Sequence, residues 1–172
     1  MRTLMLCERN DFERLPRRVK NAVKAIIVAN DKIGMIHFGK DGLYDLPGGG
    51  IEDGETINEA LIREIKEEAG ATVKPLSIEE FEHGKYVLIY KDNSSNVIIE
   101  RHFTCFFCDI EDGYTKPKLT EHEITTNQQF VFISIDEAIA ANEWHIKQGC
   151  HWVENPTYVL KHLKTTTQNK HL

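Results

Sequence analysis

Three glutamate residues recur at helical spacing in the stretch GGGIEDGETINEALIREIKEEAGA, residues 48–71: Glu64, Glu67 and Glu68. In a helix that turns about 100° per residue, the three carboxylates lie on one narrow arc of the surface. Like charges at these spacings destabilise an isolated helix by roughly 0.2–0.5 kcal/mol per pair. A hard divalent cation such as Mg²⁺ or Mn²⁺ reverses this effect, because it prefers carboxylate, carbonyl and water oxygens as ligands. The pattern therefore favours a metal site.

The charge of this stretch differs from that of the rest of the chain. Residues 49–71 carry seven acidic and two basic side chains, so they account for five of the six excess negative charges of the protein. A run of like charge is usually a solvated face. Here, however, no lysine stands four residues on to relieve the glutamates, and a glycine-rich loop directly precedes them. We therefore expect a cationic partner at this position.

The flanking residues define the helix that carries the carboxylates. Thr56 and Glu59 form the T-x-x-E capping pair that begins a helix, and Gly70 stands where a helix ends in a left-handed residue. The spacing predicts a helix over residues 57–69. The apolar stripe that turns this helix toward the core consists of Leu61, Ile62, Ile65 and Ala69.

Strand signals lie on both sides of this helix. Residues 22–30 and 32–38 are rich in β-branched side chains, and Asn30-Asp31 supplies the turn of a hairpin between them. The mixture of elements predicts an α+β fold with a mixed, largely antiparallel sheet flanked by helices. Further strands are predicted at residues 44–46, 86–90, 97–101, 103–110 and 130–133, and further helices from the Ser134-x-x-Glu137 capping box to about Trp144 and at about 155–165.

The glycine loop and the acidic helix together resemble a known signature. The pattern G-x5-E-x7-R-E-U-x-E-E-x-G-U, with U a bulky aliphatic residue, is typical of the Nudix hydrolases, the MutT-like family. Only Ala71 departs from it, and this change affects packing rather than a catalytic group. So many fixed positions over residues 49–71 make the match far more specific than a lone glycine motif. The matching residues are Gly49, Glu55, Arg63, Glu64, Ile65, Glu67, Glu68 and Gly70.

The resemblance implies a fold, an activity and a cofactor. The fold is an α/β/α sandwich around a mixed sheet, with its core at about residues 20–140. The activity is hydrolysis of a nucleoside diphosphate linked to another moiety. The implied substrates are nucleoside triphosphates, nucleotide sugars including ADP-ribose, dinucleoside polyphosphates or capped RNA ends, and the sequence does not choose between them. The cofactor is Mg²⁺, with Mn²⁺ as a substitute. The implied metal ligands are the side chains of Glu64, Glu67 and Glu68 and the backbone carbonyl of Gly48.

Two further residues of the signature have implied supporting roles. Glu55 resembles a family carboxylate that holds water or another metal. Arg63 resembles the family arginine that orients a glutamate. That role also follows physically, because an arginine fork binds a carboxylate in a bidentate contact and Arg63 lies one turn from Glu59 and Glu67. The predicted catalytic set is therefore Glu64 and Glu67 with Arg63 and Glu55.

The general base is left open by the sequence. Diphosphate esters repel nucleophiles through their own charge, so metal ions that neutralise the oxygens and activate water lower the barrier, and a carboxylate then accepts the proton. In the Nudix family this base is a glutamate of the signature or one from a distant loop. Glu121 and Glu123, in KLTEHEITTNQQ, are the distant candidates, with a solvated loop as the equal alternative.

Length and composition favour a single soluble domain. The chain has 172 residues, is 41% hydrophobic and 28% charged, and has a net charge of −6, which argues against stable binding to nucleic acid or to an anionic membrane. No apolar run approaches the ~18 residues of a membrane span, and the N-terminal segment becomes charged too early for a signal peptide. We expect one Nudix domain over residues 1–172, a cytoplasmic location, a small-molecule nucleotide substrate, and the homodimer that relatives often form.

Three alternatives accompany this interpretation. A catalytically inert nucleotide-sensing module is the alternative function, but such relatives would be expected to lose carboxylates of the signature, and this chain keeps them. Cys105 and Cys108 have C-x-x-C spacing, which suggests a zinc-dependent redox module, yet inside a strand their thiols would point to opposite faces and ordinary packing is favoured. The basic patch of Arg17, Arg18 and Lys20 either meets substrate phosphate or, as the simpler interpretation, is a solvated terminus.

Overall fold

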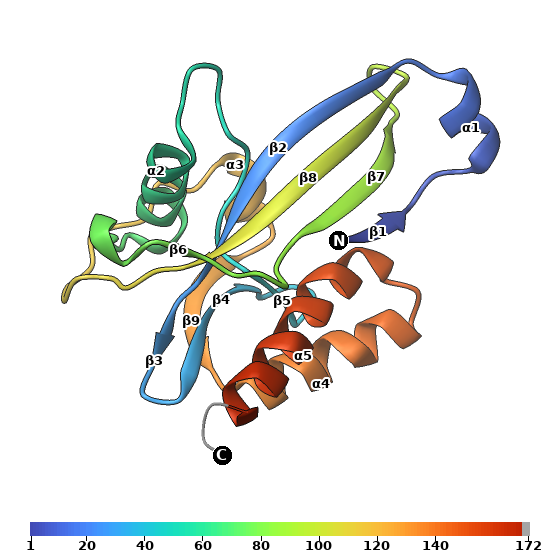
Figure 1. The fold of residues 1–172 in the computed structure, drawn as a ribbon. Helices are drawn as coiled ribbons and strands as arrows, with labels where there is room; N and C mark the ends of the chain where they lie inside the picture. Colours follow the sequence, from blue (N-terminus) through green and yellow to red (C-terminus); the bar gives the residue numbers. More distant parts are fainter. Residues whose placement is uncertain (170–172) are drawn as a thin grey trace.

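The computed structural model describes residues 1–169, and its elements form a layered body from which a long twisted ribbon of β2, β7 and β8 projects toward α1 (Figure 1). The elements are β1 Arg2–Met5, α1 Arg9–Arg14, β2 Arg17–Ile26, β3 Val28–Ala29, β4 Lys32–Phe38, β5 Leu43–Asp45, α2 Ile57–Ala69, η1 Pro75–Ser77, β6 Glu79–Glu80, β7 Tyr86–Asp92, β8 Val97–Phe107, α3 Glu121–Thr125, β9 Gln128–Ile133, α4 Ile135–Lys147, η2 His151–Val153 and α5 Glu154–Asn169.

Hydrogen bonding divides the strands into two sheets. The larger has the order β1-β7-β8-β2 with β6 also paired to β8, and the smaller has the order β3-β4-β5 with β9 also paired to β4. Pairing is parallel between β1 and β7 and between β2 and β8, and antiparallel in the other ladders of the described chain. The predicted α+β fold with mixed, mostly antiparallel pairing is confirmed, although the strands do not form one continuous sheet.

Alternate side chains of β2 enter two separate hydrophobic cores. Ala22 and Ile26 belong to a core completed by α4 and α5, the α4–α5 core, whereas Val23 and Ala25, and Ile27 directly after the strand, belong to a core completed by α2, the α2 core. Successive strand residues point to opposite faces, so this alternation places helices on both sides of the strands. Figure 1 shows the same layers, with α2 on one side and α4 and α5 on the other.

The helix predicted over residues 57–69 is confirmed as α2, with the same two ends. The Thr56 N–H donates to Glu59 Oε2 (2.9 Å) and the Glu59 N–H donates to Thr56 Oγ1 (3.3 Å), which closes the capping box. Gly70 follows with a left-handed φ of 66°. Local side-chain chemistry therefore determines both ends of this helix.

The two other local signals are also confirmed. Asn30 and Asp31 turn the chain between β3 and β4 with φ values of 51° and 59°, the positive values that a tight hairpin of this kind requires. Ser134 and Glu137 close a second capping box at the start of α4, which ends at Lys147.

The boundaries of some strands differ from the predicted ones, where the pairing partner is distant in sequence. The strand predicted at residues 22–30 begins at Arg17 as β2 and is followed by the short β3. The two strands predicted at residues 97–101 and 103–110 form one continuous strand, β8, which ends at Phe107 rather than at residue 110. The first half of β2 is exposed and lacks an alternating apolar pattern, and it pairs residue by residue with β8. Six described elements have no counterpart in the prediction: β1, α1, η1, β6, α3 and η2.

The N-terminal segment covers one face of the ribbon. β1 pairs in parallel with β7, and Phe12 and Leu15 pack against a small buried cluster that includes Val87 and Ile98. Within residues 1–169, no helix has the length and apolar character needed to cross a membrane.

Candidate active site

A glycine loop over residues 47–54 runs between β5 and α2 along the edge of β2. The Val23 N–H donates to Gly49 O (2.9 Å), which attaches the loop to the strand. Gly48 has a φ of 124°, and a Cβ atom there would collide with the carbonyl oxygen of Val23. Glycine meets both demands, because it has no side chain and tolerates positive φ.

The next glycine leaves room for a carboxylate of α2. A Cβ atom on Gly49 would lie 2.6 Å from the Glu64 carboxylate, whereas one on Gly50 would meet nothing within 4 Å. The backbone of the loop therefore packs directly against Glu64. Loop and helix form one unit whose shape depends on Gly49.

Arg63 joins this loop to three carboxylates through all of its N–H groups. Its Nε and Nη2 donate to the two oxygens of Glu55 (2.8 and 2.9 Å), a bidentate pair. Its Nη1 donates to Glu64 Oε1 (2.8 Å) and Glu67 Oε2 (3.2 Å), and Nη2 also donates to the Gly50 carbonyl (2.9 Å). A guanidinium has five N–H donors, so none is left unused. The hydrogen bonds to Glu55 and Glu64 raise the pKa of Arg63.

The partners of Arg63 differ in part from those that its spacing suggests. It contacts Glu67, one turn away, but not Glu59, whose carboxylate closes the capping box. Its bidentate partner is Glu55, which also accepts from the Glu52 N–H (3.0 Å). The hydrogen bond from Arg63, followed by that from the Glu52 amide, lowers the pKa of Glu55. Glu55 is therefore charged and committed to Arg63 in this structure.

Glu68 lies against the glycine loop rather than against Arg63. Its Oε2 accepts from the Gly48 N–H (2.7 Å). Burial raises the pKa of Glu68 to about 8, against the opposing effects of the Lys24 charge and the Gly48 amide. Burial is also the largest cause of the raised pKa of Glu64. A cation between these two carboxyl groups would stabilise the charged forms that burial disfavours.

Lys24 and Asp45 form a buried ion pair near Glu68 that the motif does not reveal. Lys24 Nζ donates to Asp45 Oδ2 (2.8 Å) and to the Leu46 carbonyl (2.7 Å), and the residue is only 7% exposed. Burial alone lowers the pKa of Lys24, but the charges of Asp45 and Glu68 outweigh it and raise the pKa. The available signal in the sequence was a lysine inside the apolar run AVKAIIVAN.

The donor set fits a hard divalent cation in chemistry but is not gathered around one point. Glu64, Glu67 and Glu68 offer oxygen ligands from one side of α2. Among the described residues, no three His, Cys, Asp or Glu side chains are grouped closely enough to hold a metal ion. Arg63 binds two of the three carboxylates, and the Gly48 N–H binds the third. A metal would therefore compete with Arg63 for Glu64 and Glu67.

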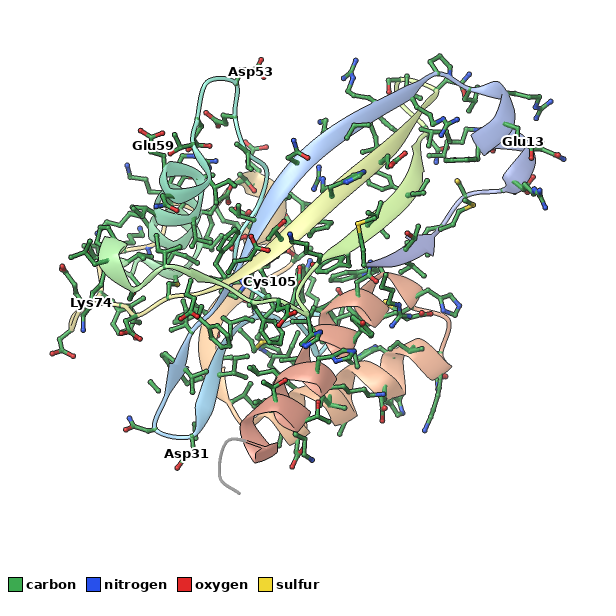
Figure 2. All side chains as sticks on the ribbon, in the orientation of Figure 1. Glu13, Asp31, Asp53, Glu59, Lys74 and Cys105 are labelled. Carbon is green, nitrogen blue, oxygen red and sulfur yellow. The ribbon has the colours of Figure 1, made fainter. Side chains whose placement is uncertain are left out.

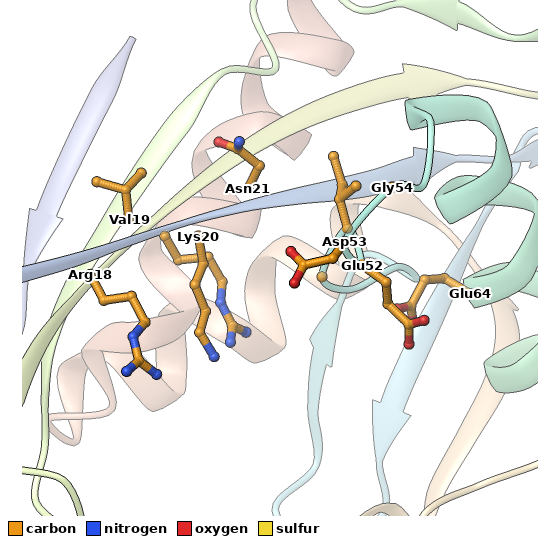
Figure 3. A pocket seen from close by; sticks show the side chains of 11 residues that line it. Arg18, Val19, Lys20, Asn21, Glu52, Asp53, Gly54 and Glu64 are labelled. Atoms are coloured by element: carbon orange, nitrogen blue, oxygen red, sulfur yellow. The ribbon is translucent and has the colours of Figure 1, made fainter.

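A cleft of about 690 Å³ opens beside this unit, between the glycine loop and the first half of β2 (Figure 3). Figure 2 shows Asp53 at the tip of the loop, while Glu59 lies on the outer side of α2. The two walls of the cleft carry opposite charge, so it can hold an anion and a cation at once. The acidic wall consists of Glu52, Asp53 and Glu64, and the basic wall of Arg18, Lys20 and Arg101.

The basic wall revises the interpretation of the N-terminal patch. Arg18 and Lys20 are exposed residues of β2 and line the cleft together with Glu64, so they stand on a paired strand rather than in a loose terminus. Arg17 instead lies over the Phe12 ring, with its Cζ 4.4 Å from the ring centroid. Arg101 comes from β8 and is aligned with Lys20, and no local motif marks it because the two meet only through strand pairing.

The two distant candidates for a base lie on the short helix α3 rather than in a loop. The Thr120 N–H donates to Glu123 Oε2 (2.6 Å), so Glu123 is occupied by its own capping box. Glu121 is exposed in the same turn. The Lys118 N–H donates to the carbonyl of Glu67 (2.8 Å), which attaches the segment before α3 to α2. The described lining of the cleft includes neither Glu121 nor Glu123.

Cys105 and Cys108 lie in different cores, as opposite faces of a strand predict. Cys105 belongs to the α4–α5 core and Cys108 to the α2 core, and both are free thiols. Burial raises the pKa of both, that of Cys108 to about 12. Protonated thiols on opposite sides of the strands pack as small apolar groups and cannot bind the same ion.

Comparisons with known proteins all identify the same family. The chain matches the NUDIX domain model over residues 19–152. It is 33% identical over 122 residues to "Putative 8-oxo-dGTP diphosphatase YtkD" of Bacillus subtilis (strain 168), covering 64% of this chain and 70% of that protein. It is 45% identical over 60 residues to "ADP-ribose pyrophosphatase" of Methanocaldococcus jannaschii, covering 33% of this chain and 36% of that protein.

Solved structures share the fold. A NUDIX hydrolase from Nitrosomonas europaea superposes with a TM-score of 0.56 at 20% identity, over 86% of this chain and 90% of that one. At this level of identity the similarity establishes the arrangement of helices and strands alone.

Proposed function

The chain belongs to the NUDIX family and is a Nudix-type hydrolase, and from this premise we propose that it is a Mg²⁺-dependent pyrophosphohydrolase of nucleoside diphosphate derivatives. The observation that carries the proposal is the Arg63 cluster at the acidic wall of the cleft. There one arginine orders Glu55, Glu64 and Glu67 beside a bipolar cavity. Mn²⁺ is the expected substitute, because it prefers the same oxygen ligands.

The residues that would hold the metal are Glu64, Glu67 and Glu68, with the Gly48 carbonyl as a backbone ligand. This assignment is supported by the setting of Glu64 and Glu68. Burial raises the pKa of both carboxyl groups, and a bound cation would stabilise their charged forms. When bound, the metal neutralises diphosphate oxygens and lowers the pKa of water. Arg63 has a positioning role, because its N–H groups hold Glu64 and Glu67 together beside the glycine loop, where a metal would share these carboxylates with it.

The proposed reaction is attack of water on a phosphorus of the diphosphate. The new P–O bond forms as the bond to the bridging oxygen breaks, and the water proton passes to a carboxylate. Among the distant candidates, Glu121 is favoured over Glu123, because the Glu123 carboxylate is already hydrogen-bonded in its capping box. A glutamate of α2 is the alternative base, with Glu64 inside the cleft.

Relatives narrow the substrate to nucleotides. Two of them are named for 8-oxo-dGTP and for ADP-ribose. We therefore propose that the substrate is a nucleoside triphosphate, a nucleotide sugar or a dinucleoside polyphosphate. A homodimer remains the expected assembly.

The decisive experiment compares hydrolysis of such a substrate panel by the wild type and by Glu67→Gln, with Mg²⁺ present. We expect activity to fall by about 100-fold or more, because a metal ligand and a partner of Arg63 are lost together. Glu59→Gln is the matched control. It makes the same chemical change on the same helix, and glutamine at that position keeps the capping box.

The outcomes separate the alternatives. Equal losses in both variants, with a lowered unfolding midpoint, would mean that the acidic residues are structural and would overturn the proposal. Inactivity of the wild type across the panel, with nucleotide binding retained, would instead support the inert sensing module.

A further inference from the structure

Three basic side chains of the cleft have no role in the hydrolytic cluster. We infer that Arg18, Lys20 and Arg101 form an anion subsite that binds a third phosphate of the substrate, beyond the diphosphate held at the acidic wall. The inference rests on the proposed function for the position of that diphosphate. It selects linear polyphosphates, such as nucleoside triphosphates, over diphosphates that end in an uncharged sugar.

Strand pairing brings the three cations to one face. Lys20 of β2 is aligned with Arg101 of β8 in the parallel ladder, so the two side chains leave the same side of the sheet. Arg18 precedes Lys20 by two residues and therefore shares this side. Figure 3 shows Arg18 and Lys20 on one side of β2, with Val19 and Asn21 on the other. The subsite is thus built on paired strands rather than on a mobile tail.

None of these cations has a partner for its charge. Within the described chain, no ion pair or side-chain hydrogen bond involves Arg18, Lys20 or Arg101. The Arg101 Nε is buried and has no hydrogen-bond acceptor. Most buried donors in folded proteins are satisfied by a partner. Because the Nε is shielded from solvent, a phosphate in the cleft would bind Arg101 through its other N–H groups, and phosphate oxygens are acceptors that suit a guanidinium well.

The opposite wall limits what the anion can be. Glu52, Asp53 and Glu64 line the same cleft, so a free anion would be repelled unless it arrived with cations. A metal-bound diphosphate meets that condition at the acidic wall. A phosphate continuing the chain would then extend toward the basic wall. Asp53 is the internal competitor, because its carboxylate turns toward the side of the cleft where Lys20 lies (Figure 3).

The test measures binding of α,β-methylene-ATP and α,β-methylene-ADP by calorimetry with Mg²⁺ present. These probes differ by one phosphate, and neither can be cleaved between the α and β phosphorus atoms. We expect the wild type to bind the triphosphate more tightly. Lys20→Gln and Arg101→Gln should weaken triphosphate binding by about tenfold, equivalent to 1.4 kcal/mol, while diphosphate binding changes little. Asp53→Asn should strengthen triphosphate binding.

Arg17→Gln is the matched control, because Arg17 is a cation of the same strand that stands outside the cleft. Three results would each overturn the inference. Lys20→Gln and Arg101→Gln could lose no more triphosphate affinity than the control, or they could lose as much affinity for the diphosphate as for the triphosphate. The wild type could also bind both probes equally tightly. If Arg101→Gln fails to fold, Lys20→Gln decides alone, because Lys20 is exposed.

Failure of this inference and failure of the proposed function are distinguishable. Binding of the probes does not require turnover, so a protein without hydrolytic activity can still show the subsite. Conversely, the enzyme could be active while Lys20→Gln and Arg101→Gln leave the KM for a nucleoside triphosphate unchanged. That result would support the proposed function and contradict the anion subsite. The expected kinetic result is a KM about tenfold higher for the triphosphate and an unchanged KM for ADP-ribose.

Discussion

Two arginines are in contrasting states: Arg63, which binds Glu64 of the acidic wall without itself lining the cleft, and Arg101, which belongs to the basic wall. All five N–H groups of Arg63 donate hydrogen bonds, to three carboxylates and one carbonyl, whereas the buried Nε of Arg101 has no acceptor. The first cluster is complete within the chain, and it holds its carboxylates in place before any ligand arrives. The second is incomplete within the chain. The difference indicates that the carboxylates near the acidic wall are fixed in position by the chain itself, whereas the cations of the basic wall are available to bind an anion.

The lysines of β2 extend this comparison, because Lys24 lies buried beneath the acidic wall and Lys20 lies unpaired in the basic wall. Replacing Lys24 by Met should lower the free energy of unfolding by about 3–5 kcal/mol, since it leaves the buried Asp45 carboxylate unpaired. Urea denaturation measures this. Lys161→Met, which breaks an exposed pair with Glu143, should cost less than about 1 kcal/mol. Similar small losses in both variants would show that the Lys24 pair is not buried in solution.

A second change tests whether the acidic wall depends on the complete Arg63 network. Arg63→Gln should reduce kcat/KM by about 100-fold, because Glu55, Glu64 and Glu67 lose their common partner. Arg63→Lys should not restore activity, since an ammonium cannot make the bidentate contact. Lys66→Gln, on the same helix, is the control. Rescue by lysine would mean that charge alone matters at this position.

A smaller change tests how closely the loop and the helix fit. Gly49→Ala should lower kcat/KM by about tenfold, because its Cβ atom would lie 2.6 Å from the Glu64 carboxylate and would displace it. Gly50→Ala adds the same atom where nothing lies within 4 Å, so its loss should be smaller. Thermal denaturation of both variants shows whether folding is affected. An equal loss of activity in the two would disprove the steric explanation.

The helix α2, which carries Glu64 of the acidic wall, could be predicted from the sequence alone. The capping pair Thr56 and Glu59 and the terminal Gly70 set the limits of α2, and the spacing of its glutamates set their common face. The same signal is present at Thr120-x-x-Glu123, where it begins α3 in place of the expected loop. Capping is local chemistry, so it can be recognised without knowing what the helix packs against.

The basic wall could not be read in this way. Lys20 and Arg101 are aligned only because β2 pairs in parallel with β8, and a register between distant strands has no local signature. The same applies to Lys24 and Asp45, which are an ordinary lysine and aspartate until the fold buries them together. Even Glu55, a member of the motif, has a partner that spacing alone did not indicate.

The sequence by itself determined the carboxylate helix, its caps, the glycine loop and the family, because each depends on residues within one or two turns of each other. The tertiary structure decided which charges are paired, which are buried and which face the cleft. Those properties depend on desolvation and on contacts between distant segments, and both arise only when the strands and helices are assembled.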